Sequence, residues 1–150
     1  MQEATLLADP GRELGSASTR RLRKLGQVPG VLYGKGGDAT TLSVPSAELR
    51  AILVEAGGNA VIRLNVGGEE HLTLVKDIQR HPVRNTIDHI DFQLVSMTDS
   101  VHVEVAIHLI GEAELVNHAG GVVEQAIFHV HVHCSPVSIP AFVEADISDM

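Results

Sequence analysis

The sequence of 150 residues contains one cysteine, no tryptophan and one tyrosine. The single cysteine, Cys134, excludes an internal disulfide and a zinc site built from several cysteines. No apolar run reaches the roughly 18 residues that a membrane-spanning helix needs. The first residues, MQEATLLADPGRE, lack the cationic start and the apolar run of a signal peptide. These absences predict a soluble, cytoplasmic protein that contacts no membrane.

Lysine and arginine are absent after Arg84. Residues 1–93 contain eleven basic and eleven acidic side chains, whereas residues 94–150 contain eight acidic side chains and no Lys or Arg. The whole formal net charge of -8 therefore lies in the second part. Because like charges repel, that part is a poor partner for nucleic acid, while the first part can still present a local basic patch. Such asymmetry predicts two modules with different partners.

The segment LVSMTDS, from Leu94 to Ser100, lies between two strand-like runs and is the expected boundary. We therefore expect domains at residues 1–94 and 95–150. A composition of 44% hydrophobic and 20% charged residues is typical of globular proteins. Fourteen glycines and six prolines, with many β-branched residues, favour strands and turns over long helices.

The patterns of the first part predict strands separated by two short helices. Gly67-Gly68 is typical of a hairpin turn, and Pro45 suits the first position of a helix. The expected strands are residues 3–8, 28–34, 41–44, 59–66, 69–79 and 87–95, and the expected helices are residues 16–25 and 45–56. This order indicates an α+β domain with a mostly antiparallel or mixed sheet.

The second part is expected to be all-β. Apolar and polar residues alternate in VHVEVAIHL and in IFHVHVHC, and AFVEADIS is a further strand-like run. The chain stops at Met150, shortly after that last run, and for this reason we expect the acidic second domain to be incomplete.

The helix expected at residues 16–25 has two distinct sides. At 100° per residue, Arg20, Arg23 and Lys24 lie opposite Leu22 and Leu25, and Arg21 lies on the flank. We expect Ser16 or Ser18 to be the N-cap and Gly26 to end the helix. We call Arg20, Arg21, Arg23 and Lys24 the basic cluster.

The basic cluster has no acidic neighbour in the sequence between Glu13 and Asp38, so we expect it to lack ion pairs within its own helix. Its chemistry supports two interpretations equally: a contact with nucleic-acid phosphates, or an ordinary solvated helix face. Tyr33 follows closely and has a ring that can stack on a base.

A second group of polar residues lies in QRHPVRNTIDHIDF, from Gln79 to Phe92. On a strand, His89 and Asp91 share one face and Ile90 and Phe92 share the other, so the apolar pair is expected to face the core. A carboxylate suits a base edge, because the guanine N2 amine is a donor in the minor groove. The alternative is a His-Asp pair for acid–base catalysis, although no nucleophile motif or glycine-rich phosphate loop accompanies it.

Three histidines at alternate positions form a third group, which we call the histidine ladder: His129, His131 and His133. They share one side of a strand. They are either exposed strand residues or ligands of a metal ion, and the next acidic residue is Glu144. The alternative function that follows is a metal-binding or enzymatic β protein centred on the histidine ladder.

The blocks GSASTRRLRKLGQVPGVLYG and DIQRHPVRNTIDHIDF closely resemble bacterial large-subunit ribosomal protein number twenty-five, in the long form that includes the general stress protein CTC. VHVEVAIHLIGEAELVNHAGGVVEQ and CSPVSIPAFVEADIS resemble the rest of that long form. The resemblance implies an N-terminal β-barrel-like domain with two short helices and a β-rich C-terminal domain. It also implies a structural constituent of the large ribosomal subunit that binds the loop-E-type internal loop of 5S rRNA at the central protuberance.

This family resemblance implies no enzymatic activity, no cofactor, no metal and no DNA partner. Neighbouring ribosomal proteins are possible partners of the acidic domain. The residues expected to bind RNA are those that match the family's motifs, together with Lys24 from the basic cluster and His81 from the second block: Arg12, Thr19, Arg20, Arg21, Arg23, Lys24, Tyr33, Gln79, His81, His89 and Asp91. Ser16 stands where the family has a lysine, which removes one expected cation.

Overall fold

A computed structural model describes residues 4–150. The chain divides into two compact units, of which the first ends at Asp99 and the second spans Ser100–Met150. The first unit extends beyond Leu94 because the residues that follow are bonded to it. The backbone N–H of Val95 donates to Leu72 O at 3.0 Å, and Asp99 pairs with a lysine of the first unit.

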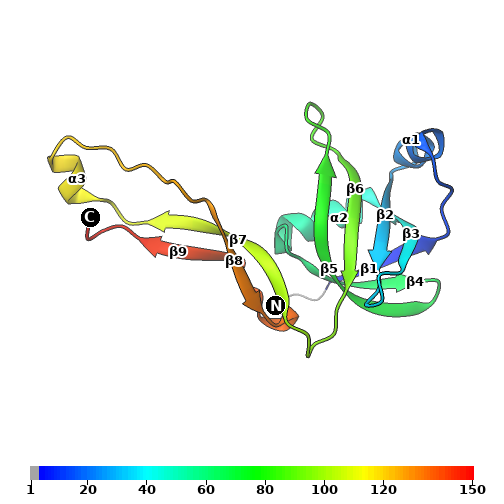
Figure 1. Ribbon diagram of the computed structural model, residues 1–150. Coiled ribbons are helices and arrows are strands. Elements are labelled where there is room, and N and C mark those ends of the chain that lie inside the picture. Colours follow the sequence, from blue (N-terminus) through cyan, green and yellow to red (C-terminus); the bar gives the residue numbers. More distant parts are fainter. Residues whose placement is uncertain (1–3) are drawn as a thin grey trace. The chain divides into compact units, whose positions relative to one another are not determined.

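Six strands of the first unit form a closed barrel in the order β1-β3-β2-β6-β5-β4 (Figure 1). The β1–β4 and β2–β6 pairs are parallel and the other pairs are antiparallel. The predicted α+β, barrel-like domain with two helices is confirmed. Its elements are β1 (Ala4–Pro10), α1 (Ser16–Lys24), β2 (Gln27–Tyr33), β3 (Ala39–Pro45), α2 (Ser46–Ala56), β4 (Val61–Val66), β5 (Glu69–Arg80) and β6 (Ile87–Leu94).

Helix α1 ends at Lys24, one residue before the predicted end, and the predicted stop, Gly26, follows with φ 75°, a conformation that glycine adopts without steric cost. The predicted serine N-cap is wrong. Gly15 is the N-cap residue and no side chain caps the helix. The hydroxyl of Ser18 donates instead to the carbonyl oxygens of Glu13 and Gly15, at 2.8 and 3.0 Å, and Ser18 is the buried residue of the helix.

The two leucines that the sequence places opposite the basic residues differ in burial. Leu25 is 76% exposed because it follows the last helical residue, and Leu22 is half-buried. This nine-residue helix therefore buries little apolar surface, since Ser18 is its buried residue and Leu22 is half-buried. Most of the surface of α1 is therefore exposed, including the side that carries the basic cluster.

The second helix and the β4–β5 turn follow from local chemistry. Pro45 ends β3 and is the N-cap of α2, whereas the sequence placed it at the first position of the helix. Gly57 follows the last residue of α2 with φ 78°. Gly67 and Gly68 both have positive φ, 59° and 93°, as the tight turn of a two-residue hairpin requires.

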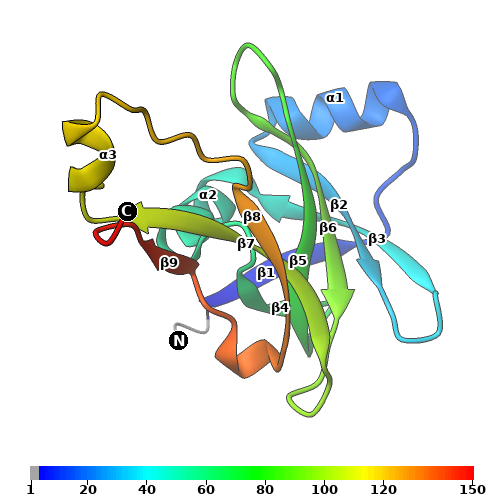
Figure 2. The same cartoon turned by 60° about the vertical axis from the view of Figure 1, so that its left-hand side comes forward.

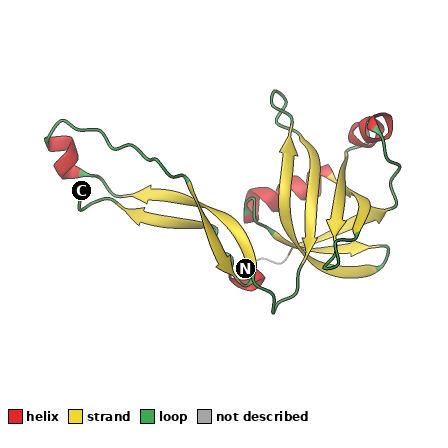
Figure 3. Cartoon of the chain, viewed as in Figure 1, coloured by secondary structure: helices red, strands yellow, loops and turns green. Residues whose placement is uncertain are grey.

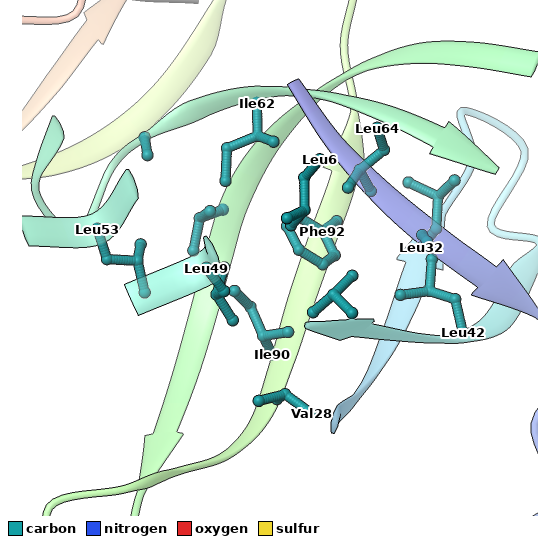
Figure 4. Packing of buried hydrophobic residues seen from close by; sticks show 14 of the residues in the cluster. Leu6, Val28, Leu32, Leu42, Leu49, Leu53, Ile62, Leu64, Ile90 and Phe92 are labelled. Atoms are coloured by element: carbon teal, nitrogen blue, oxygen red, sulfur yellow. The ribbon is translucent and has the colours of Figure 1, made fainter. Parts of the chain in front are cut away.

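The interior of the barrel is filled by aliphatic side chains around one aromatic ring, Phe92 (Figure 4). Ile90 and Phe92 of β6 are fully buried, as their alternation predicts. Removing such a ring typically costs about 3–5 kcal/mol of stability. The other fully enclosed members of the cluster come from the neighbouring elements: Leu6, Leu42, Val44, Leu49, Ile62 and Leu64.

The second unit is a three-stranded sheet in the order β8-β7-β9 (Figure 3). Its strands are β7 (Val101–Ile110), β8 (His129–Cys134) and β9 (Phe142–Asp146), with a short helix α3 (Glu114–His118) and a 3-10 turn (Pro136–Ser138) between them. β7 pairs antiparallel with β8 and parallel with β9. Val101, Val103 and Val105 are buried and alternate with exposed residues, which confirms the predicted β character. Sequence reasoning did not predict α3.

Within residues 4–150, no helix is long and apolar enough to cross a membrane.

Candidate nucleic-acid interface

Strands β2, β6 and β5 are neighbours in the barrel (Figure 2). Four of the predicted RNA-contacting residues belong to these strands and share their outward face. Gln79 of β5 is the register partner of His89 on β6. Asp91 is the partner of Val31 on β2, two positions before Tyr33. Since side chains alternate along each strand, these residues point away from the core that Ile90 and Phe92 fill. We call Tyr33, Gln79, His89 and Asp91 the polar face.

His89 and Asp91 are in contact within the polar face. The imidazole Nδ1 lies 2.9 Å from the carboxylate Oδ1, and the two side chains are 24% and 22% exposed. The contact is an ion pair when the imidazole is protonated. Oδ1 itself is buried and accepts no hydrogen bond from another group in residues 4–150. Asp91 therefore has acceptor capacity that the fold leaves unused.

The basic cluster is divided by the fold. Arg20 and Lys24 are exposed and form no ion pair within residues 4–150. Arg21 lies 3.9 Å from Glu13, and Arg23 lies 4.0 Å from the carboxylate of Asp88. The expectation of no ion pair within the helix itself is confirmed, since Glu13 precedes α1 and Asp88 belongs to β6.

Arg23 also fixes the helix to the barrel. Its Nε donates to the carbonyl oxygen of Asp88 at 3.2 Å. This bond joins α1 to the start of the strand that carries His89 and Asp91. The basic cluster and the polar face are therefore held in one compact unit rather than on separate parts of the chain.

Three further predicted residues have partners inside the fold. The Nε of Arg12 donates to Gly30 O at 3.5 Å. The hydroxyl of Thr19 donates to the carbonyl oxygens of Gly15 and Ser16 at 3.0 and 3.1 Å. His81 accepts two backbone hydrogen bonds at its Nδ1. All three help to shape the site, whatever else they contact.

Sequence reasoning did not assign a role to Lys35, which closes the first unit. Its ammonium lies 2.9 Å from Asp99 Oδ2 and donates to Ser96 Oγ at 3.0 Å. The hydrogen bonds from Lys35 and Ser96 hold the pKa of Asp99 at about 2, below its ordinary 3.8. No local pattern indicates this pair, since its members are far apart in the sequence.

The histidine ladder lies on an exposed face of β8. His133 stacks on His102 of β7, with ring centroids 4.3 Å apart. Within residues 4–150, no group of three or more His, Cys, Asp or Glu side chains is arranged to hold a metal ion. The stack is therefore a cross-strand packing contact, and it gives the metal-binding alternative no support.

Two family models match the chain in the order of the two units. The Ribosomal L25p family model matches residues 8–92, and the model of the C-terminal domain of ribosomal protein TL5 matches residues 100–150. The second match begins at the residue where the second unit begins.

Individual relatives agree with these matches. General stress protein Ctc of Bacillus subtilis is 44% identical over 147 residues, which cover 98% of this chain and 72% of the relative. Large ribosomal subunit protein bL25 of Halothermothrix orenii is 39% identical over 154 aligned residues, covering 100% of this chain and 69% of the relative. The bL25 protein of Methylobacillus flagellatus is also 39% identical, over 97% of this chain and 72% of the relative. The chain therefore belongs to the Ribosomal L25p family.

Proposed function

We propose that the chain is a structural constituent of the large ribosomal subunit and that its first unit binds 5S rRNA. The observation behind this proposal is the arrangement within that unit, where a cationic helix is bonded to a strand with an outward polar face. The names of the relatives support the ribosomal role, since several of them are large ribosomal subunit proteins. The role requires neither a catalytic residue nor a cofactor, and it places the protein in the cytoplasm.

The two groups of residues have different tasks in this proposal. Arg20 and Lys24 are free to contact phosphates, which sets the position of the protein on the RNA without reading its sequence. The polar face supplies donors, acceptors and one exposed aromatic ring for unpaired or non-canonically paired bases. The shallow minor groove of RNA presents such base edges together with 2′-hydroxyls. We infer that the polar face provides the selectivity for a loop-E-type internal loop.

Asp91 fits this task better than it fits a phosphate contact. A carboxylate repels phosphates, but it accepts hydrogen bonds from amines of guanine or cytosine. Since Oδ1 is buried, such a donor meets the exposed part of the Asp91 side chain, which is 22% exposed. His89 at 2.9 Å keeps the carboxylate in place and limits its rotation.

For the second unit we propose a protein partner. It contains acidic side chains and neither Lys nor Arg, so it repels RNA phosphates and favours a basic surface. The partner we propose is a neighbouring ribosomal protein with such a basic surface.

A binding assay with the full chain tests the 5S rRNA proposal. The chain is titrated against 5S rRNA, against 5S rRNA whose internal loop is replaced by Watson–Crick pairs, and against an unrelated structured RNA of the same length. We expect the affinity for intact 5S rRNA to exceed the other two by at least tenfold. Equal affinity for all three RNAs would contradict the proposal.

A further inference from the structure

A groove with a cavity volume of about 590 Å³ lies between α1 and the loop that joins β5 to β6, residues 81–86. Basic side chains from two distant parts of the sequence line it. Arg20, Arg23 and Lys24 come from α1, and Arg84 comes from the loop. Of the residues that line it, only Asp88 is acidic, and Asp88 is already paired with Arg23. We call this feature the basic groove.

The positive charge of the basic groove is not neutralised by the protein. Arg20, Lys24 and Arg84 are exposed and have no ion-pair partner within the part of the chain that the structure describes. Cations that converge on one cavity repel each other, and an anion between them removes that cost. The groove is therefore suited to a negatively charged ligand.

An unpaired amide points to the same conclusion. Gln27 lines the groove, and its Oε1 is buried and has no hydrogen-bond partner in residues 4–150. A glutamine amide has one acceptor and two donor positions, which exchange places when the amide rotates by half a turn. With the NH2 group in the present position of Oε1, Gln27 would carry a donor beside the groove rather than an unpaired acceptor.

The loop that carries Arg84 is held in one conformation by His81. Nδ1 of His81 accepts hydrogen bonds from the backbone N–H groups of Val83 and Arg84, at 3.2 and 3.1 Å. The backbone N–H of His81 donates to Thr86 O at 2.8 Å. Asn85, with φ 53°, completes the turn. Arg84 is therefore fixed at its backbone before any ligand binds, which lowers the entropy cost of binding.

We propose that the basic groove binds a phosphate of the RNA backbone, contacted by Lys24 and Arg20 from α1 and by Arg84 from the loop. The inference rests on the proposed function and extends it, since Arg84 was not among the predicted RNA-binding residues. A guanidinium presents several N–H donors in a plane, a geometry that matches phosphate oxygens. His81 is a positioning residue in this proposal, because it acts through the backbone of Arg84.

Salt dependence of RNA binding tests the proposal with the full chain. Each phosphate contact contributes roughly 0.7–0.9 to the slope of log affinity against log salt concentration. We expect Arg84→Ala to lower the slope for 5S rRNA by about one such increment and to weaken binding severalfold at low salt.

The matched control is Arg63→Ala, which removes one cation elsewhere on the same unit. Arg63 is on β4 and is the register partner of Leu72 on β5. Leu72 is about 26 Å along β5 from Arg80, at which the strand reaches the groove loop. We expect this variant to keep the wild-type slope.

The possible results separate the groove from the proposed function. Binding of 5S rRNA with an unchanged slope in Arg84→Ala overturns the groove proposal and leaves the proposed function intact. If wild type binds 5S rRNA no better than a plain A-form RNA duplex, the proposed function fails. The slopes of the two variants on that duplex then decide the groove proposal, which stands only if Arg84→Ala alone lowers the slope.

A separate titration distinguishes RNA phosphate from a small free anion. Inorganic phosphate is added while the arginine side-chain signals are followed by nuclear magnetic resonance. The RNA proposal is overturned if two results occur together. Inorganic phosphate saturates Arg84 at low millimolar concentration, and Arg84→Ala does not change the RNA slope. The groove is then a small-anion site.

Discussion

The backbone of Gly30 approaches Ile90 so closely that a Cβ at residue 30 would lie 2.8 Å from the Ile90 carbonyl oxygen. The same Cβ would lie 3.2 Å from the side chains of Ile90 and Leu42. Gly30 and Ile90 are register partners in the parallel pair of β2 and β6. A backbone oxygen in a closed barrel has little freedom to move away, so this contact requires glycine.

We therefore expect Gly30→Ala to lower the free energy of unfolding of the first unit by about 1–3 kcal/mol, the usual cost of overpacking. Urea unfolding followed by the fluorescence of Tyr33, the only tyrosine, reports on this unit alone. Gly58→Ala is the control, since a Cβ there has nothing within 4 Å and its φ is not positive. Equal stability of the two variants would argue against the close approach.

We expect Asp91→Asn and Arg20→Ala to affect RNA binding in different ways. Asp91→Asn loses a charged acceptor at a base edge. One specific base contact is worth roughly 1–3 kcal/mol, so we expect discrimination between intact 5S rRNA and RNA with a paired loop to fall about tenfold. Arg20→Ala removes a phosphate contact and weakens binding to both RNAs by the same factor. Arg20 is preferred to Arg23, because Arg23 also bonds Asp88. A parallel loss in both variants would contradict this division of tasks.

Two substitutions of His81 separate its role as an acceptor from its shape. His81→Leu removes Nδ1 and frees the N–H groups of Val83 and Arg84. We expect it to lower the salt slope as much as Arg84→Ala does, because the loop no longer fixes Arg84. In His81→Asn the side-chain oxygen takes the place of Nδ1 as the acceptor, and we expect the wild-type slope to return. Identical behaviour of the Leu and Asn variants would assign His81 another role.

The contribution of Asp99 to stability depends on pH. Its native pKa of about 2 is below its ordinary 3.8, so the folded state binds the proton less tightly than the unfolded state. The stabilisation is complete above about pH 4 and disappears as the pH falls to about 2. Asp99→Asn should therefore be less stable than wild type at pH 6 and equal to it at pH 2, as measured by Tyr33 fluorescence. A stability difference that stays constant down to pH 2 would exclude this linkage.

The alternation of side chains along β6 made the outward position of two site residues predictable from sequence. The two-residue period of IDHIDF correctly places Ile90 and Phe92 in the core and His89 and Asp91 outside it. That inference needs only local information, because each strand residue faces one side or the other.

Local sequence patterns did not predict the contacts between distant segments. The pairing of Arg23 with Asp88 joins residues 65 positions apart, and Arg84 approaches the basic cluster only because β6 lies beside β2 in the closed barrel. The exposure of Leu25, which the sequence placed on the same side as Leu22, has a related cause. The helical wheel assumes one more helical residue than α1 contains, and at the end of a helix that single residue decides which way the side chain points.

The position of β6 between β2 and β5 means that the barrel cannot close before this last strand has been made. Helix α1 and its cations are complete early, whereas β6, the last strand of the barrel, must be made before it can insert between β2 and β5. On the proposed division of tasks, an unfinished chain attracts any RNA phosphate and distinguishes none. On the same division of tasks, discrimination between RNAs requires the closed barrel, because β6 carries His89 and Asp91 between β2 and β5.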